Sequence, residues 1–271
     1  MASEKDEAVT PRKTDGIEPK RRRGIYLLPN LFTTAALFAG FFAIVSAMGG
    51  NFRHAAIAVF VAMLLDGIDG RVARLTNTQS AFGAEYDSLA DMVSFGLAPA
   101  LVIYQWSLIE LGQLGWLAAF IYTAAAALRL ARFNTQVDTA DKRYFQGLPS
   151  PSAAALVAGL VWVGSSYGFD GETWRLPAFM LTVLAGLLMV SNIRYHSFKG
   201  LDLRGRVPFV TMLVVVLVFV LISIDPPQVL FAGFLLYALS GPVLTLTNLR
   251  RRRAERKAHL EGTDRAGEDK P

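Results

Sequence analysis

Four aspartates lie close together in a part of the sequence that is otherwise almost entirely apolar. Asp66 and Asp69 are three residues apart and Asp87 and Asp91 are four apart, so each pair would share one face of a helix. The two apolar segments that carry the pairs are joined only by the short polar link 76–80, which is typical of antiparallel neighbouring helices. The sequence therefore predicts that all four carboxylates meet at one end of two adjacent helices.

Carboxylates gathered in this way need protons or cations between them. Negative charges in a low-dielectric setting repel one another strongly and are costly to desolvate. All-oxygen ligation suits hard divalent ions such as Mg²⁺ or Mn²⁺, and a two-metal carboxylate site is a recurrent device for phosphoryl transfer. Two structural interpretations compete: an intramembrane aspartate that bonds a neighbouring helix, and a solvated D-x2-D pair at a helix end. Because intramembrane carboxylates are functional by default, the pattern favours a phosphate-containing substrate at a membrane surface.

The composition indicates a membrane protein with several spans. Of the 271 residues, 53% are hydrophobic and only 18% are charged, and the charges crowd into the two ends of the chain and a few short gaps. That is too apolar for an ordinary soluble domain. The sequence has no cysteine, which excludes disulfides, cysteine-ligated zinc and cysteine nucleophiles. The formal net charge of +5 is explained by arginines that flank membrane spans, so no nucleic-acid partner is expected.

We expect an all-α integral membrane protein with about eight transmembrane helices, because a span needs about 20 mostly apolar residues. The expected spans are residues 30–48, 55–75, 84–107, 114–134, 151–168, 175–193, 207–224 and 228–247. With the N-terminus inside, the inner segments hold 25 of the Lys and Arg residues and the outer segments hold 2, Arg53 and Arg175. The positive-inside rule then predicts a multi-pass protein of the cell (cytoplasmic, inner) membrane, with both termini and the aspartates on the cytoplasmic side.

The aspartates belong to a longer pattern, Asp66-x2-Asp69-Gly70-x2-Ala73-Arg74-x8-Gly83-x3-Asp87-x3-Asp91. At every fixed position this pattern resembles the signature of the CDP-alcohol phosphotransferase family. The resemblance implies a helical-bundle membrane enzyme that cleaves the pyrophosphate of a CDP-linked lipid, transfers the phosphatidyl group to an alcohol and releases CMP. Members of the family are commonly homodimers, and the resemblance implies a homodimer here.

Further segments resemble the branch of this family whose acceptor is L-serine. They are "LPNLFTTAALFAGFFAI", "DSLADMVSFGLAPA", "LRLARFNT", "YFQGLPSPSAAA" and "LMVSNIRYHSFK". The resemblance thus implies that CDP-diacylglycerol and L-serine are the substrates and that phosphatidylserine is the product. The signature does not separate siblings that use glycerol 3-phosphate, inositol phosphate or choline. A cation- or proton-coupled transporter and a lipid-binding scaffold are the alternatives from other functional classes.

The resemblance also assigns roles to individual residues. Asp66, Asp69 and Asp87 would bind two divalent ions, Mg²⁺ or Mn²⁺. Asp91 would complete the metal site and be the catalytic residue, either as general base for the acceptor hydroxyl or by positioning the alcohol. The residues that match CDP-diacylglycerol-binding positions are Asn30, Thr33, Gly70, Ala73, Arg74, Ser80 and Gly83. For Asn30 and Thr33, the start of the first helix is an alternative interpretation, with Asn30 as its N-cap.

Two arginines near the inner end of the fourth expected span are candidates for a second anion site. Arg129 and Arg132 lie within "LRLARFN" and share one helix face. They could bind the carboxylate of the acceptor or a lipid phosphate, and positive-inside anchoring is the alternative.

We expect the chain to divide into four parts. These are a disordered basic cytoplasmic tail (1–24), a catalytic membrane core (25–200), two additional transmembrane helices (201–249) and a basic cytoplasmic tail (250–271). No motif assigns a role to the last two helices or to the tails.

Overall fold

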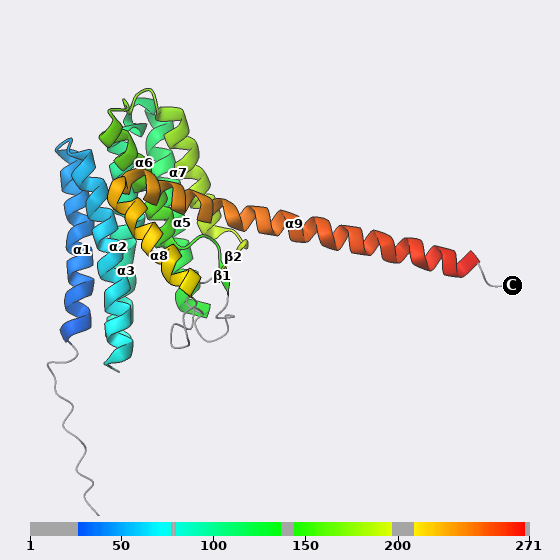
Figure 1. Cartoon of the computed structure of the whole chain (residues 1–271). Helices are drawn as coiled ribbons and strands as arrows, with labels where there is room; N and C mark the ends of the chain where they lie inside the picture. Colours follow the sequence, from blue (N-terminus) through cyan, green and yellow to red (C-terminus); the bar gives the residue numbers. More distant parts are fainter. Residues whose placement is uncertain (1–26, 77, 79, 137–143, 197–208, 269–271) are drawn as a thin grey trace, which may run out of the picture.

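The structure, a computed structural model, describes residues 27–76, 78, 80–136, 144–196 and 209–268, which form a helical bundle (Figure 1). In chain order its elements are α1 (Leu27–Met48), α2 (Phe52–Leu75), α3 (Ala81–Asp91), a π-helical segment (Met92–Leu97), α4 (Ala98–Trp106), a 3-10 turn (Leu108–Leu111), α5 (Gln113–Gln136), β1 (Tyr144–Gln146), α6 (Ser150–Tyr167), α7 (Arg175–Val190), β2 (Arg194–His196), α8 (Phe209–Ile224) and α9 (Pro226–Glu268). Each apolar segment expected to span the membrane overlaps a described helix, although the expected segment 175–193 runs past the end of α7 and residues 207–208 lie outside the described residues. The expected tail 1–24 lies outside the described residues.

Four of the described helical stretches are long and apolar enough to cross a membrane. They are Pro29–Met48, Ala81–Trp106, Gln113–Thr135 and Pro226–Thr247, while α7 and α8 are shorter apolar helices. The second of these stretches combines α3, the π-helical segment and α4 in one continuous helix. A span of about 20 residues matches the apolar thickness of a bilayer, so the chain is a helical membrane protein.

Small residues let the first two helices approach each other closely. The buried residues of α2 include Ala55, Ala58 and Ala62, and those of α1 include Ala43 and Ala47. Side chains of this size permit tight contact between helix backbones, which is the usual basis of helix association in membranes. Helices α1 and α2 consequently have the most extensive contact of any two elements among the described residues. This contact fixes the position of α2.

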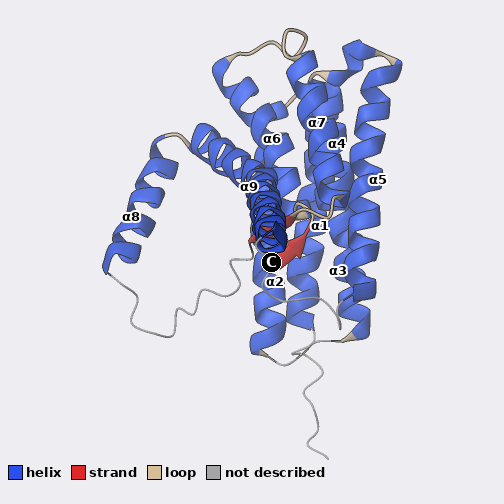
Figure 2. Cartoon of the chain, turned by 90° about the vertical axis from the view of Figure 1, so that its right-hand side faces the viewer, coloured by secondary structure: helices blue, strands red, loops and turns tan. Residues whose placement is uncertain are grey.

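A short antiparallel pair of strands joins two connecting segments at the side of the bundle (Figure 2). Phe145 of β1 faces Tyr195 of β2 in this pair. The Tyr195 ring is fully buried, and its hydroxyl donates a hydrogen bond to the carbonyl of Ala238 in α9 at 3.0 Å. Burial raises the pKa of Tyr195 to about 12, so the hydroxyl stays protonated and remains a donor at neutral pH.

The last two helices lie apart from the compact bundle. In Figure 2, α8 stands to one side and reaches the remaining helices through α9. Helix α9 packs on α6 and then continues beyond the bundle as a single helix to Glu268 (Figure 1). The expected end of the last span at residue 247 is therefore not the end of a helix, because nothing in 248–257 breaks helical geometry: the run is rich in Arg and contains no Gly or Pro.

Candidate active site

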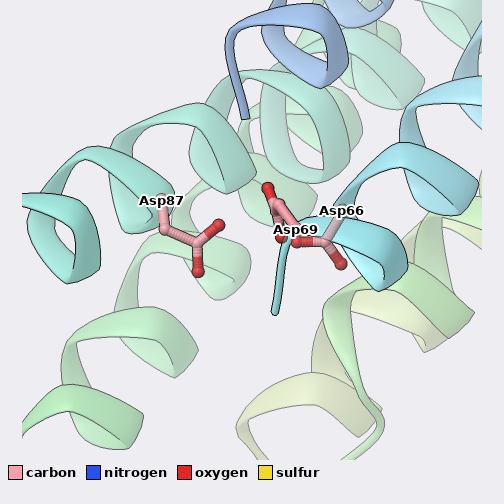
Figure 3. A group of neighbouring side chains, drawn as sticks. All are labelled: Asp66, Asp69 and Asp87. Atoms are coloured by element: carbon pink, nitrogen blue, oxygen red, sulfur yellow. The ribbon is translucent and has the colours of Figure 1, made fainter. Parts of the chain in front are cut away.

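Three aspartates converge where α2 approaches its C-terminal end. Asp66 and Asp69 project from α2 and Asp87 projects from α3, with their carboxylates directed toward one another (Figure 3). One carboxylate oxygen from each residue lies within 4.8 Å of the others. The short link between Leu75 and Ala81 brings the two helices together, as their spacing in the sequence predicts. The three side chains thus form a compact group of oxygen ligands.

Asp91 joins this group from the last position of α3. Its carboxyl group lies within hydrogen-bonding distance of the Asp66 carboxyl group. Asp87 and Asp91 are one helical turn apart, so both face the same neighbours. The two aspartates of α2 and the two of α3 therefore lie close together. Their mutual repulsion favours a bound cation or a shared proton.

Helix α1 holds one of the carboxylates in place. The Thr33 hydroxyl lies 2.7 Å from Asp69 Oδ2 and donates to it, and both residues are buried, at 4% exposure each. A hydrogen bond to a charged acceptor is shorter and stronger than one between neutral groups. The structure thus places Thr33 against a carboxylate of the site, as the partner that orients Asp69.

The donor set fits hard divalent cations. It consists of carboxylate oxygens from three residues, with a fourth carboxylate adjacent, and contains no sulfur or imidazole. Oxygen-only ligation with several carboxylates suits Mg²⁺ or Mn²⁺, and Mg²⁺ usually completes its coordination with water and substrate phosphate. The cluster is therefore compatible with a divalent metal site.

Three of the expected nucleotide-binding residues lie together at the start of α3. Ser80 is the N-cap of α3, and its hydroxyl accepts a hydrogen bond from the backbone N–H of Gly83 at 3.0 Å. A Cβ added to Gly83 would lie 3.1 Å from the Ser80 hydroxyl oxygen and 3.5 Å from Asn30 Oδ1. The contact with Ser80 is tight and the one with Asn30 is ordinary, so Gly83 leaves room for the capping hydroxyl. Asn30 lies inside α1, which begins at Leu27, so the alternative that it is the N-cap of this helix is wrong.

The remaining three expected residues follow Asp69 along α2. A Cβ added to Gly70 would meet nothing within 4 Å, so the backbone beside Asp69 is open on that side. Ala73 is half-buried, and Arg74 is exposed in the last turn of α2. An exposed guanidinium one turn beyond an open backbone position is available to a phosphate from outside the bundle.

The two arginines of α5 differ in what they contact. The Arg129 guanidinium donates from Nη1 to the hydroxyl of Ser150, at the first turn of α6, at 2.9 Å. It is also within range of an electrostatic interaction with Asp91. Arg132 instead donates to the carbonyl of Val190 and to Asn192 Oδ1, both at 3.3 Å. Arg129 therefore joins α5 to the start of α6 and interacts electrostatically with Asp91, whereas Arg132 joins α5 to the end of α7.

Two features of the site are missing from the sequence-based expectations. Ser150 holds Arg129, and its position at a helix start after "GLP" is the only signal for it. The π-helical segment directly after Asp91 is the other feature. Its signal is Pro99, which removes a backbone donor inside an apolar span.

Comparisons with known proteins identify the family to which the chain is similar. A profile of the CDP-alcohol phosphatidyltransferase family matches residues 26–217. The chain is 41% identical over 219 residues to the CDP-diacylglycerol–serine O-phosphatidyltransferase of Helicobacter pylori, covering 80% of this chain and 90% of that protein. The enzyme of the same name from Mycobacterium tuberculosis is 37% identical over 186 residues, or 65% of this chain and 64% of that protein. The archaetidylserine synthase of Methanothermobacter thermautotrophicus is 32% identical over 184 residues, or 67% of this chain and 75% of that protein. The chain belongs to the CDP-alcohol phosphatidyltransferase family.

Proposed function

We propose that this protein transfers the phosphatidyl group of CDP-diacylglycerol to the hydroxyl of L-serine, giving phosphatidylserine and CMP. The observation that carries the proposal is the compact group of Asp66, Asp69 and Asp87 in a chain that is 41% identical to a serine O-phosphatidyltransferase along 90% of that relative. A carboxylate group of this kind suits a pyrophosphate substrate, since bound cations would offset both sets of negative charge.

Asp66, Asp69 and Asp87 would hold two divalent ions, Mg²⁺ or Mn²⁺, with Asp91 completing the site. When bound, such ions supply neutralisation of the charge on the pyrophosphate. The chain's own contribution is to fix the ligands before substrate arrives. Thr33 supports this assignment, because its hydrogen bond holds the Asp69 carboxylate in one orientation.

Asp91 is the proposed catalytic residue. As the serine oxygen forms its bond to the phosphorus of the phosphatidyl group, the bond from that phosphorus to the CMP oxygen breaks. The hydroxyl proton must leave during this exchange, and a carboxylate within hydrogen-bonding reach can accept it or orient the hydroxyl that carries it. The position of Asp91 next to Asp66, at the edge of the carboxylate group, supports this role.

The CDP moiety is proposed to lie along the open side of α2 and the start of α3. Gly70 leaves room beside Asp69, and Arg74 offers a fork of N–H donors for a phosphate. Ala73, Asn30 and Thr33 complete the lining, together with Ser80 and Gly83 at the α3 terminus. Small residues on this side permit a bulky nucleotide to approach the backbone.

Arg129 is the proposed partner of the serine carboxylate. It interacts electrostatically with Asp91, and the Ser150 hydroxyl accepts a hydrogen bond from one of its nitrogens. Among the described residues, its Nε is buried without a hydrogen-bond partner, so the guanidinium has a donor to offer. Arg132 is a weaker candidate because its contacts are with α7. A choline acceptor would leave Arg129 facing a second cation, which favours a carboxylate-bearing acceptor.

The topology and assembly are further parts of the proposal. We place eight spans in the cytoplasmic (inner) membrane, with both termini and the site facing the cytoplasm, on the strength of the 25 to 2 distribution of Lys and Arg. Residues 25–200 would form the catalytic core, 201–249 two additional spans, and 1–24 and 250–271 the basic tails. A homodimer is proposed from family membership.

The experiment that tests this function is CMP release from CDP-diacylglycerol by the purified protein, with Mg²⁺ or Mn²⁺ present. L-serine, glycerol 3-phosphate, inositol phosphate and choline are supplied as acceptors in parallel, and Asp91→Asn is the control variant. We expect release only with serine, and loss of release with EDTA and in the variant. Release with another acceptor alone would overturn the choice of serine and keep the reaction type. Folded protein that releases no CMP with any acceptor would favour a transporter.

A further inference from the structure

The helix that carries Asp87 and Asp91 changes its geometry immediately after Asp91. Residues Met92–Leu97 are π-helical, and the N–H of Ala98 bonds to the carbonyl of Val93, five residues earlier. An α-helix bonds four residues back, so this stretch holds about one residue more per turn. Single turns of this kind occur frequently at functional sites and mark a deliberate change in helix register.

Pro99 explains why the α-helical pattern fails here. In an α-helix the N–H of residue 99 would donate to the carbonyl of Phe95, and proline has no N–H. A side chain from another helix provides the missing donor: the Tyr122 hydroxyl, on α5, donates to the Phe95 carbonyl at 3.0 Å. Tyr122 and Phe95 are both fully buried, where an unpaired carbonyl would be costly.

The π turn sets the direction in which the aspartates point. In an uninterrupted α-helix, Asp91 and Ala98 would share one face, since seven residues make almost two full turns. Ala98 and Val102 are fully buried and face the core of the bundle. One additional residue in the turn rotates the preceding part of the helix by about 100° relative to the part that follows. The Asp91 carboxylate is thereby turned away from the core face and toward Asp66.

Helix α1 also packs closely against this turn. The Ser94 hydroxyl, within the π segment, donates to the carbonyl of Ala36 at 3.1 Å. A Cβ added to Gly40 would lie 2.7 Å from the Ser94 hydroxyl oxygen and 2.8 Å from its Cα, so α1 passes as closely as a glycine permits. The π turn is therefore held between α1, which accepts a hydrogen bond from it, and α5, whose Tyr122 hydroxyl donates one to it.

We propose that Tyr122 is a positioning residue of the active site: by satisfying the Phe95 carbonyl it stabilises the π turn that aims Asp87 and Asp91 at the carboxylates of α2. The inference rests on the proposed function for its catalytic readout, and it goes further by assigning a role to a buried residue outside the family signature. Tyr122 acts through the helix and does not touch substrate.

The test compares two tyrosines that make the same kind of bond. Tyr122→Phe and Tyr195→Phe each remove a fully buried hydroxyl that donates to a backbone carbonyl at 3.0 Å, but only the first carbonyl lies in the π turn. We expect kcat for serine-dependent CMP release to fall about tenfold in Tyr122→Phe, with KM for serine nearly unchanged, because small misplacement of reacting groups is costly. Tyr195→Phe should keep the wild-type kcat at a matched loss of thermal stability.

Mn²⁺ binding to the purified protein, followed by electron paramagnetic resonance, provides a readout that does not need turnover. Because Asp87 precedes the π turn, Tyr122→Phe should weaken Mn²⁺ binding about tenfold, within the range known for groups that orient metal ligands. Tyr195→Phe should bind like the wild type. Wild-type protein that binds Mn²⁺ but releases no CMP with serine would refute the proposed function and leave the positioning role to be decided by the binding ratio.

The double variant Pro99→Ala/Tyr122→Phe separates positioning from stability. Replacement of the proline returns the backbone N–H that can bond to Phe95 in α-helical register, so thermal stability should recover relative to Tyr122→Phe. kcat and Mn²⁺ affinity should stay low, because the α-helical register turns Asp91 away from Asp66. Recovery of kcat together with stability would overturn the proposal, as would equal kcat values for Tyr122→Phe and Tyr195→Phe.

Discussion

Helices α2 and α8 are both apolar enough to be expected as membrane spans, yet they are packed in opposite ways. Helix α2 has seven buried residues and contacts α1, α4 and α6, whereas none of the described side chains of α8 is buried and its main contact is α9. The difference cannot come from hydrophobicity, since α8 is the more apolar of the two and carries no charge.

Side-chain size accounts for the difference. Four of the seven buried residues of α2 are Ala, while α8 reads FVTMLVVVLVFVLISI and has no Ala or Gly. Lipid tails are as apolar as leucine, so burial of Val and Leu against another helix gains little in a membrane. Small residues allow close backbone contact, and polar groups such as Thr33 and Asp69 then bond across it. The region that holds the chemistry is the region that small residues bring together.

Removal of one carboxylate should have the largest effect. Asp69→Asn keeps the size of the side chain but removes the charge of the carboxylate that Thr33 orients. We expect CMP release to fall on the order of 10³-fold, as for loss of a preorganised electrostatic contact. The measurement is serine-dependent CMP release at saturating metal. Glu85→Gln removes an exposed acid from the same part of α3 and should retain activity. Equal losses in both variants would mean that overall charge, and not this cluster, supports the reaction.

An enlarged residue at the tight contact should have the next largest effect. In Gly40→Val the new side chain would meet Ser94 within 2.8 Å at its Cα, so we expect the free energy of unfolding to fall by about 3 kcal/mol. Thermal unfolding in detergent measures this. Gly233→Val in α9 is the matched control, since a Cβ there would meet nothing within 4 Å. Similar unfolding temperatures for the two variants would contradict the close approach of α1 to the π turn.

The pattern of residues predicts the helices and the meeting of the carboxylates well. Apolar segments locate each helix, and the spacing of the aspartates places them on facing sides of α2 and α3, because both follow from helical periodicity. The spacing also treats Arg129 and Arg132 as a pair, whereas in the structure the two side chains have different partners. Positions three residues apart on a helix differ by about 60° in direction, which is enough for the Arg129 guanidinium to reach Ser150 of α6 and for that of Arg132 to reach the end of α7.

Other features depend on contacts between segments that are distant in the sequence. The π turn requires both Pro99 and a hydroxyl from α5, and no local pattern announces the Tyr122 bond to Phe95. The β1–β2 pair joins two connecting segments about 50 residues apart. The spacing of apolar residues predicts neither feature. It shows which face of a helix is buried, but it does not identify the segment that packs against this face.

A smaller effect is expected where α1 orients a ligand without being one. Thr33→Val keeps the shape of the side chain and removes the donor to Asp69 Oδ2. We expect the Mn²⁺ concentration for half-maximal activity to rise about tenfold, the lower end for groups that orient metal ligands. Metal titrations of CMP release measure the shift, and Thr33→Ser, which retains the hydroxyl, should stay close to the wild type. A loss of activity at every Mn²⁺ concentration, with no shift, would point to a direct role of Thr33 in substrate binding.

The smallest effect is expected in α8, and it returns to the contrast with α2. Val59→Ala and Val215→Ala remove the same atoms from the two helices, at side chains that are 1% and 49% exposed. The first leaves a space in packed surroundings and should lower the free energy of unfolding by about 2 kcal/mol. The second exchanges one lipid-facing apolar surface for another, so stability should change by less than about 0.5 kcal/mol and CMP release should not change. Thermal unfolding of both variants in the same detergent makes the comparison. A loss for Val215→Ala as large as that for Val59→Ala would mean that α8 is covered by protein in the assembled enzyme, and that a second chain supplies the contacts that a single chain lacks.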